Sequence, residues 1–257
     1  MERLAFEKKG RVAFLKMNRS EKRNALDDIA MREMIDCIKE ADSDPDVRAI
    51  VIEGDGPAFS AGADLDYLLR LSRNTIEANY DDSAEFRRLL LEIYYSRKLT
   101  CALVRGPALA GGFGIALACD LIVGSEKARF GFTEVKVGFV PALVLNFAMK
   151  KLNEADVRRL VLTGKIVDST EAIRMGIMAE IIPDHEIENY LDNFLGEFCR
   201  GTSRNAVALT KEVLRGVSGL NLPEALRYST HKNAEARSTE DFQKGVNSFL
   251  KKEKPEW

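Results

Sequence analysis

Two glycine-rich stretches, each following a β-branched run, most constrain what this chain can fold into. The first runs from Ala58 to Leu65 (AFSAGADL) and the second from Gly106 to Asp120 (GPALAGGFGIALACD). Such stretches are typical of places where a strand gives way to a helix and backbone N–H groups stay uncovered. Fixed in a dry pocket, such groups stabilise negative charge on a carbonyl oxygen, and loss of one donor costs roughly 3 kcal/mol in the transition state. The two stretches therefore predict an oxyanion hole.

Around these stretches the apolar pattern alternates between strands and helices. This alternation predicts an α/β fold whose parallel strands place their loops, and with them the functional residues, at one edge of the sheet. The first two strands are expected to form a hairpin. The expected strands are Leu4–Glu7, Val12–Met17, Val47–Ile52, Cys101–Arg105, Leu121–Val123 and Ala179–Ile182. The first expected helix starts at about Asp27 and stops at Ser43-Asp44-Pro45. The other expected helices are Leu65–Leu71, Ser83–Ser96, Gly112–Cys119, Leu143–Lys151, Glu154–Leu162 and Ser169–Met175.

The last part of the chain is predicted to be helical throughout, from about Thr202 to Leu250. We therefore expect an α/β core over residues 1–200 and a C-terminal helical region over residues 201–257. Such a region serves oligomerisation, acts as a lid, or simply packs on the core. The polar segment 72–82, between two expected helices, is predicted to be mobile.

Composition excludes several classes of protein. The 257 residues are 30% charged, but the charges nearly cancel to a net −2, which gives no strong field to attract nucleic acid or an anionic membrane. No apolar run approaches the roughly 20 residues that span a bilayer, and we expect a soluble, cytoplasmic protein. The four cysteines are far apart, so we expect buried free thiols rather than a zinc site or disulfides.

Common catalytic and nucleotide-binding motifs are incomplete. The Gly112-Phe-Gly114 pair has Leu117 where the dinucleotide fingerprint needs its third glycine. Gly164-Lys165 lacks the upstream glycine and the following hydroxyl of a phosphate-binding loop. Ser218 lacks the second glycine of a nucleophile elbow. The two histidines, His185 and His231, are expected at the surface.

Glu134 differs from most of the 40 acidic residues because it lies in an apolar and aromatic segment, Phe130 to Val135. Burial there would raise its pKa towards the range useful for general acid and base catalysis. The alternative is an acidic residue at a helix start that accepts hydrogen bonds from backbone N–H groups. The sequence leaves both interpretations open.

Several ordered motifs run along nearly the whole chain. They are NRSEKRNAL from Asn18, AFSAGADL from Ala58, GPALAGGFGIALACDL from Gly106, ARFGFTEVKVGFVP from Ala128, LTGKIVDSTEAIRMGIMAEIIP from Leu162 and the terminal FLKKEKPEW. Together they resemble the crotonase superfamily, the enoyl-CoA hydratase/isomerase enzymes. This resemblance implies a spiral of β-β-α units with a C-terminal helical region, assembled as trimers or dimers of trimers.

The resemblance also implies roles for particular residues. The backbone N–H groups of Ala63 and Gly111 would bind the thioester oxygen of an acyl-CoA, and Glu134 would transfer protons. Coenzyme A belongs to the substrate, and neither a separate cofactor nor a metal is implied. The residues expected to contact CoA are Lys22, Arg23, Ala61, Asp64 and Leu65, with Phe249 and Lys252 of the C-terminal region, from the same or a neighbouring subunit, at its nucleotide end.

One departure from the family pattern bears on the reaction. Hydratases of this family use two glutamates, and the first of these positions is Gly114 here. We expect Gly114 to leave space for a bulkier acyl group or an ordered water. One carboxylate suffices to move a double bond, so site chemistry favours isomerisation of an enoyl-CoA. Hydration of a 2-enoyl-CoA, thioester or carbon–carbon bond hydrolysis, and non-catalytic CoA binding remain alternatives.

Overall fold

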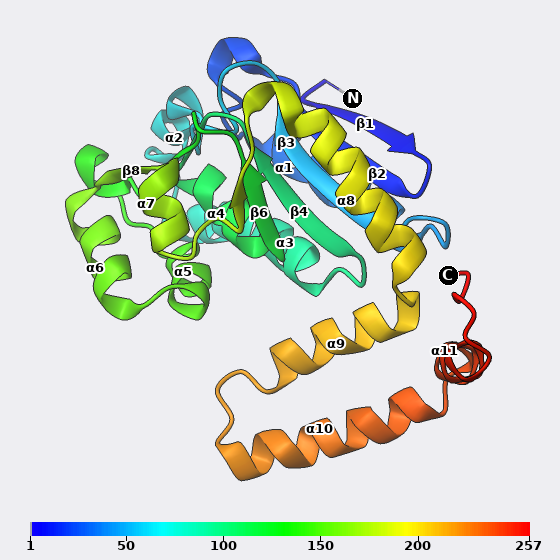
Figure 1. Cartoon of the computed structure of the whole chain (residues 1–257). Coiled ribbons are helices and arrows are strands. Elements are labelled where there is room, and N and C mark those ends of the chain that lie inside the picture. Colours follow the sequence, from blue (N-terminus) through cyan, green and yellow to red (C-terminus); the bar gives the residue numbers. More distant parts are fainter. Residues whose placement is uncertain (1) are drawn as a thin grey trace. The chain divides into compact units, whose positions relative to one another are not determined.

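The computed structural model describes residues 2–257, which divide into two compact units (Figure 1). The first comprises residues 2–96 with Thr100–Tyr190, and the second comprises Arg97–Leu99 with Leu191–Trp257. This division falls about ten residues before the boundary at residue 200 that the sequence suggests. The assignment of separate functions to the two regions stays a prediction.

A six-stranded sheet of order β1-β2-β3-β4-β6-β9 runs through the first unit. The hairpin β1–β2 is antiparallel, as predicted, while β2–β3, β4–β6 and β6–β9 pair in parallel. The register pairs Val12 with Ala49 and Cys101 with Leu121. The strands are β1 (Leu4–Lys9), β2 (Val12–Met17), β3 (Ala49–Gly54), β4 (Leu99–Val104), β6 (Leu121–Gly124) and β9 (Glu180–Ile181).

The helix α1 (Asp28–Ser43) shows why the local sequence signals succeed. Asp27 accepts a hydrogen bond from the Ala30 amide and so caps the first turn. Met31, Met34 and Ile38 lie on its buried face at helical spacing, whereas Ile29, expected on the same face, is exposed. The mixed α/β class predicted from the sequence is confirmed.

A second, three-stranded sheet was not predicted. It has the order β5-β7-β8, with β5 (Pro107–Leu109) parallel to β7 (Arg129–Gly131) and β7 antiparallel to β8 (Ile166–Asp168). Each strand has three residues, too few for an alternating pattern to show in the sequence. This sheet fixes the beginning of the second glycine stretch, because β5 leads directly into α4 (Gly111–Ala118).

The polar connection expected between two helices over residues 72–82 is itself helical for its larger part. Helix α2 (Leu65–Leu71) ends as predicted, but α3 (Ile76–Tyr95) starts seven residues earlier than expected. The Thr75 hydroxyl accepts a hydrogen bond from the Ala78 amide and caps this helix. The early turns are polar because they are largely exposed, and not because they lack structure.

Helices complete the first unit: α5 (Leu145–Lys151), α6 (Glu154–Thr163) and α7 (Ser169–Arg174), with short 3-10 turns at Ser20–Lys22, Glu134–Val137 and Asp184–Glu186. The helix α8 (Ile187–Gly201) leads out of it and was not predicted. Its signal is nevertheless present, since Ile187, Leu191, Leu195 and Cys199 recur every four residues and are all buried.

The second unit contains α9 (Arg204–Gly216), α10 (Leu222–Arg237) and α11 (Glu240–Leu250), as the helical pattern predicts. The Ser203 side chain caps α9 and also donates to Asp241 at 2.5 Å, which ties the start of α9 to α11. Large apolar side chains remain exposed on all three helices, among them Leu214, Leu222 and Phe249.

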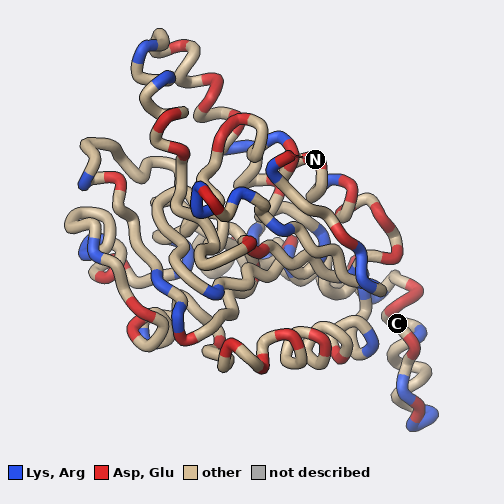
Figure 2. Tube along the Cα trace, turned by 90° about the horizontal axis from the view of Figure 1, so that it is seen from above, with Lys and Arg blue, Asp and Glu red and all other residues tan. Residues whose placement is uncertain are grey.

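Basic and acidic residues are interspersed along the described chain (Figure 2), in keeping with its small net charge. Among the residues that the structure describes, no helix combines the length and apolar composition needed to cross a membrane. All four cysteines are buried thiols outside disulfides, and both histidines are exposed, as predicted.

Candidate active site

The two glycine stretches lie side by side. The Ser60 amide donates to the Pro107 carbonyl at 3.2 Å, and the Leu109 amide donates to the Ser60 carbonyl at 2.9 Å. These two hydrogen bonds form a parallel bridge between Ser60 and Ala108. These bonds join the two extended segments that lead into the turns. Both turns therefore start from the same edge.

Glycine is required where the two turns touch. Gly62 has a φ of +88°, and a Cβ atom on it would lie 2.8 Å from the Ala110 Cβ and 3.1 Å from the Gly111 nitrogen. A Cβ atom on Gly112 would lie 2.6 Å from the Ser60 Cβ. A side chain at either position would force the two turns apart.

The backbone amides of Ala63 and Gly111 stay available in this arrangement. On either side of Ala63, the Gly62 amide donates to the Ser60 hydroxyl and the Asp64 amide to the Leu26 carbonyl, but within the described chain the Ala63 amide donates to no acceptor. Gly111 is the first residue of α4, so its amide has no acceptor within the helix. Ala110 before it has a φ of 49° and a ψ of −124°, a conformation unusual for a residue with a side chain.

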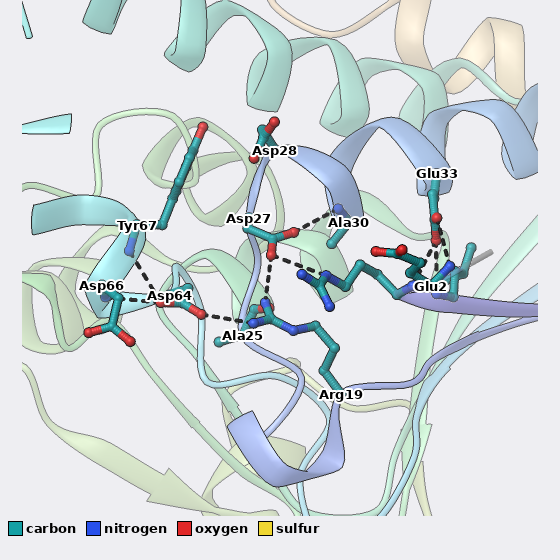
Figure 3. A network of polar contacts seen from close by, with 12 residues as sticks. Glu2, Arg19, Ala25, Asp27, Asp28, Ala30, Glu33, Asp64, Asp66 and Tyr67 are labelled. Atoms are coloured by element: carbon teal, nitrogen blue, oxygen red, sulfur yellow. Dashed lines mark hydrogen bonds and ion pairs between the residues drawn. The ribbon is translucent and has the colours of Figure 1, made fainter. Parts of the chain in front are cut away.

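A buried polar network holds the first of these turns in place (Figure 3). The Arg19 guanidinium contacts Asp27 at 2.9 Å and Asp64 at 3.0 Å, and it also donates to the Ala25 carbonyl at 2.8 Å. Asp64 in turn caps α2 by accepting from the Asp66 and Tyr67 amides. Burial alone would raise the pKa of Asp64, but the hydrogen bonds from the Tyr67 amide, Arg19 and the Asp66 amide outweigh it and hold this pKa below its ordinary value.

The Asn24 side chain fixes the start of the same turn. Its amide group donates to the carbonyls of Asp55 and Ala58, each at 2.8 Å, and its side-chain oxygen accepts from the Arg19 amide. The Ser60 hydroxyl donates back to the Asn24 carbonyl at 2.8 Å. The backbone that leads to Ala63 is therefore held by side chains on both sides.

Glu134 is a buried carboxylic acid with a free oxygen. It begins the short 3-10 turn Glu134–Val137, is 7% exposed, and its Oε2 atom is buried without a hydrogen-bond partner. Burial raises the pKa of its carboxyl group above the ordinary value, against a hydrogen bond from its own backbone that lowers it. Of the two interpretations left open by the sequence, the burial and the raised pKa favour the acid–base one.

These groups line one cavity of about 790 Å³. The other carboxylates in its wall are engaged, since Asp64 pairs with Arg19, Asp66 with Lys22, and Asp82 accepts from the Tyr67 hydroxyl. Glu134 is thus the wall carboxylate that pairs with no other residue of the described chain. Of the residues predicted for the site, the cavity wall contains Lys22, Arg23, Ala61, Ala63, Asp64, Leu65, Gly111 and Glu134.

The expectation that Gly114 leaves free space in the site is wrong. Gly114 is buried in α4 and does not line the cavity. A Cβ atom on Gly114 would lie 2.7 Å from the Val144 Cβ and closer still to the Val144 Cγ1. The buried Val144 side chain therefore fills the place that a side chain at position 114 would take, and Val144 itself reaches the cavity wall.

Phe249 and Lys252 lie in the second compact unit. Phe249, near the end of α11, is 82% exposed, and Lys252 follows the helix with a φ of +58°. Their contact with CoA stays a prediction.

Comparison with known proteins identifies the family. The model of the enoyl-CoA hydratase/isomerase family matches residues 7–257. The chain belongs to this family. It is 38% identical to a Thermus thermophilus protein that carries the name enoyl-CoA hydratase provisionally, over 96% of this chain and 97% of that protein. It is 30% identical to the short-chain-enoyl-CoA hydratase of Clostridium acetobutylicum, over 100% of this chain and 97% of that enzyme.

Solved structures share the fold of this enoyl-CoA hydratase/isomerase family member. The crystal structure of an enoyl-CoA hydratase from Shewanella pealeana superposes with a TM-score of 0.94 at 28% identity, covering 99% of this chain and 96% of that one. The predicted membership of the crotonase superfamily and the crotonase-like fold are confirmed. The chain is an enzyme of this family, and its exact reaction is not distinguished by these likenesses.

Sequence reasoning missed several residues of the cavity wall. Tyr67 and Asp82 come from different helices and are brought together only by the turn between α2 and α3. Phe86 lies one turn along α3 from Asp82. Its Cζ atom is 3.3 Å from the place that a Cβ atom on Gly111 would take. The spacing of four residues places Asp82 and Phe86 on one helix face. This signal can be recognised only when α3 is known to start before Asp82.

Proposed function

We propose that this enzyme moves the double bond of a 3-enoyl-CoA into conjugation with the thioester, using Glu134 as its single proton carrier. The observation that carries the proposal is the buried, unpartnered Oε2 of Glu134 in a cavity whose other wall carboxylates are engaged. The free oxygen of this carboxylate can accept a proton without first breaking an ion pair or a hydrogen bond.

The proposed reaction needs one base and one oxyanion hole. The thioester oxygen accepts hydrogen bonds from the Ala63 and Gly111 amides, which lowers the free energy of the enolate. Glu134 removes a proton from C2, and the C2–H electron pair forms the enolate. As the enolate collapses, the double bond shifts from C3–C4 to C2–C3 and the same proton returns from Glu134 to C4. The raised pKa of Glu134 suits both steps.

The packing of Val144 against Gly114 supports isomerisation over hydration. Hydration has to add hydroxide at C3 and a proton at C2, and a second carboxylate is the natural group to hold the water. The place where a side chain from α4 would reach is filled by the apolar Val144. An apolar side chain at this place offers no second carboxylate to hold a water, which hydration needs and a proton shuttle does not.

Lys22 and Arg23 support the proposed binding of the CoA phosphates. Both line the cavity, and the Lys22 side chain is half exposed beside Asp66 at 2.9 Å. We further propose that Phe249 and Lys252 contact the nucleotide end and that the enzyme works in the cytoplasm as a trimer or a dimer of trimers. Neither a metal nor a separate cofactor is required by the proposed chemistry.

Hydration of a 2-enoyl-CoA is the second candidate. It is favoured by the relatives, because those from Thermus thermophilus and Clostridium acetobutylicum bear the name of enoyl-CoA hydratases. In that reaction Glu134 alone would have to position the water and transfer the proton.

Mass analysis of products separates the candidates. The protein is incubated with 3-enoyl-, 2-enoyl- and 3-hydroxyacyl-CoA thioesters. Isomerisation leaves the mass unchanged while the absorbance of the conjugated enoyl thioester appears, and hydration adds the mass of one water. Release of free CoA would indicate thioester hydrolysis, and binding without turnover across the panel would indicate a CoA-binding protein; either of these results, or hydration without isomerisation, overturns the proposal.

A further inference from the structure

A hydrogen-bonded pair of side chains closes one part of the cavity. The Tyr67 hydroxyl of α2 donates to the Asp82 carboxylate of α3, and both residues line the cavity that contains Glu134. Ser83 and Phe86 of α3 line the same part. We call the part of the cavity wall formed by Tyr67, Asp82, Ser83 and Phe86 the α2–α3 arm.

The same pair also borders a hollow on its other side. Tyr67 and Asp82, with Met31, line a second pocket of about 390 Å³. The other residues around it are charged: Asp28, Arg32, Arg70, Asp81 and Glu85. The Tyr67–Asp82 pair therefore stands between the main cavity and a polar hollow in which acidic groups outnumber basic ones.

Charge indicates which end of the substrate lies in the α2–α3 arm. A CoA thioester held by its carbonyl oxygen at Ala63 and Gly111 extends from that point in two directions. Its phosphates are attracted to the cations Lys22 and Arg23 and repelled by the carboxylate of Asp82. The acyl chain is left to pass Phe86 and to end near Tyr67 and Asp82.

The chemistry at the end of the arm is that of a hydrogen-bond acceptor. Tyr67 occupies only Oδ1 of Asp82, and among the described residues no group donates to Oδ2. Burial raises the pKa of Tyr67, and the hydrogen bond to Asp82 raises it further, so the phenol keeps its proton and continues to donate. Asp82 thus has a fixed orientation and one free oxygen.

We propose that Asp82, oriented by Tyr67, makes this enzyme selective for acyl chains whose far end carries a hydrogen-bond donor such as a hydroxyl group, and against chains that end in a carboxylate. This inference rests on the proposed function of the cavity. Asp82 is then a specificity residue and Tyr67 a positioning residue. A hydroxyl end donates to the free oxygen of Asp82, whereas a carboxylate end meets a like charge.

The test compares 3-enoyl-CoA thioesters of graded and matched chain length that end in methyl, hydroxyl or carboxylate. The readout is the ratio of kcat/KM between the hydroxyl and carboxylate ends at the best length. We expect the wild type to prefer the hydroxyl end by at least about tenfold, the size of one hydrogen bond to a charged group. Asp82→Asn, which keeps the shape and removes the charge, should bring the ratio towards one, and Tyr67→Phe should lower it less.

A matched control is available one residue away. Asp81 borders the outer hollow but not the main cavity, so Asp81→Asn removes the same charge outside the proposed contact. It should leave the ratio unchanged. An equal fall of the ratio in Asp81→Asn would mean that the overall negative charge of this region causes the preference, and it would overturn the role of Asp82. A wild type with no preference would overturn it as well.

Binding separates a failure of this inference from a failure of the proposed function. Saturated acyl-CoA thioesters with the three chain ends are titrated into the wild type and Asp82→Asn by calorimetry, where no turnover is needed. If no enoyl-CoA reacts but the hydroxyl end binds more tightly in an Asp82-dependent manner, the selectivity holds and the isomerase proposal fails. If isomerisation is observed but neither rate nor affinity depends on the chain end, only the selectivity fails.

Discussion

The Val144 side chain occupies the position into which a side chain on Gly114 would project, with the Val144 Cβ only 2.7 Å from where a Cβ atom on Gly114 would be. The two residues lie on separate elements, Gly114 in α4 and Val144 directly before α5. Their contact determines what can be built at position 114, and it corrects the simple expectation that a glycine there leaves room.

A carboxylate at position 114 is therefore expected to function only if Val144 is removed as well. Gly114→Glu alone should lower the free energy of unfolding by about 1–3 kcal/mol or more through overpacking and should gain no hydration activity. Gly114→Glu combined with Val144→Gly provides the space, because even the Cβ of an alanine at position 144 would still collide. Hydration of crotonyl-CoA, with Val144→Gly alone as the control, checks this; rapid hydration by Gly114→Glu alone would contradict it.

Replacing Glu134 by glutamine should remove isomerase activity while CoA-thioester binding persists. Loss of a general base lowers the rate by roughly 10²–10⁴-fold, and glutamine keeps the size of the side chain. Kinetics on a 3-enoyl-CoA and calorimetry with a saturated acyl-CoA measure the two effects. Glu126→Gln, at an exposed position, serves as the control. Full activity in Glu134→Gln would refute the assignment of the base.

The raised pKa of Glu134 has consequences for both activity and stability. As the pH rises through this pKa, Glu134 loses its proton and kcat/KM should increase, with a midpoint above the ordinary value of 4.5. Because the pKa is higher in the folded than in the unfolded protein, the stability falls as the pH rises through the window between the two values. Glu134→Gln should thus be more stable than the wild type at neutral pH and similar to it in acid, as urea unfolding at several pH values would show. A stability difference that is independent of pH would argue against this.

The Arg19 network should contribute strongly to stability. Arg19→Met leaves Asp27 and Asp64 buried without their shared cation, an effect of about 3–5 kcal/mol on the free energy of unfolding. The lowered pKa of Asp64 means that its contribution is present above its unfolded pKa and is lost as the pH falls through its folded value. Arg32→Met, which breaks an exposed ion pair with Asp28, is the control and should change stability by less than about 1 kcal/mol. Equal effects of the two substitutions would contradict the assigned role.

Gly62→Ala tests whether contact between the two glycine turns matters for catalysis. The substitution places a Cβ against Ala110 and the Gly111 nitrogen at a φ of +88°, so it should lower kcat by moving the two amides apart. Gly176→Ala is a matched control, since Gly176 also has a positive φ, +73°, but a Cβ there would meet no atom within 4 Å. Both variants should lose about 1–3 kcal/mol of stability from backbone strain, and only Gly62→Ala should lose activity. A similar loss of kcat in both variants would show that contact between the two glycine turns has no special importance for catalysis.

The parts of the fold that the sequence predicts are those with local signals. The cap at Asp27, the apolar spacing along α1 and the glycine turns after β3 and β4 are all contained within short segments. The three-residue strands of the second sheet are defined by distant partners, such as Phe130 opposite Val167, and leave no such signal. The early start of α3 was missed because an exposed polar helix and a polar loop have similar compositions.

The candidate site was predictable where main-chain groups and glycines define it, and less so where side chains from distant elements meet. Ala63, Gly111 and Glu134 lie in or beside recognisable motifs, and the structure brings them to one cavity. That Val144 fills the space beside Gly114, or that Tyr67 donates to Asp82, depends on contacts between residues 15 or more positions apart. Composition and spacing do not encode those contacts.

The amides of Ala63 and Gly111 belong to the main chain and are positioned by neighbouring glycines, Asn24 and Ser60, so mutation of their own side chains does not delete them. The α2–α3 arm, in contrast, is made entirely of side chains, and α2 buries none of its residues. On the proposed assignment, substitutions in the exposed helix α2 and in the first turns of α3 would change which acyl group is recognised, while the main-chain amides that hold the carbonyl end would stay the same.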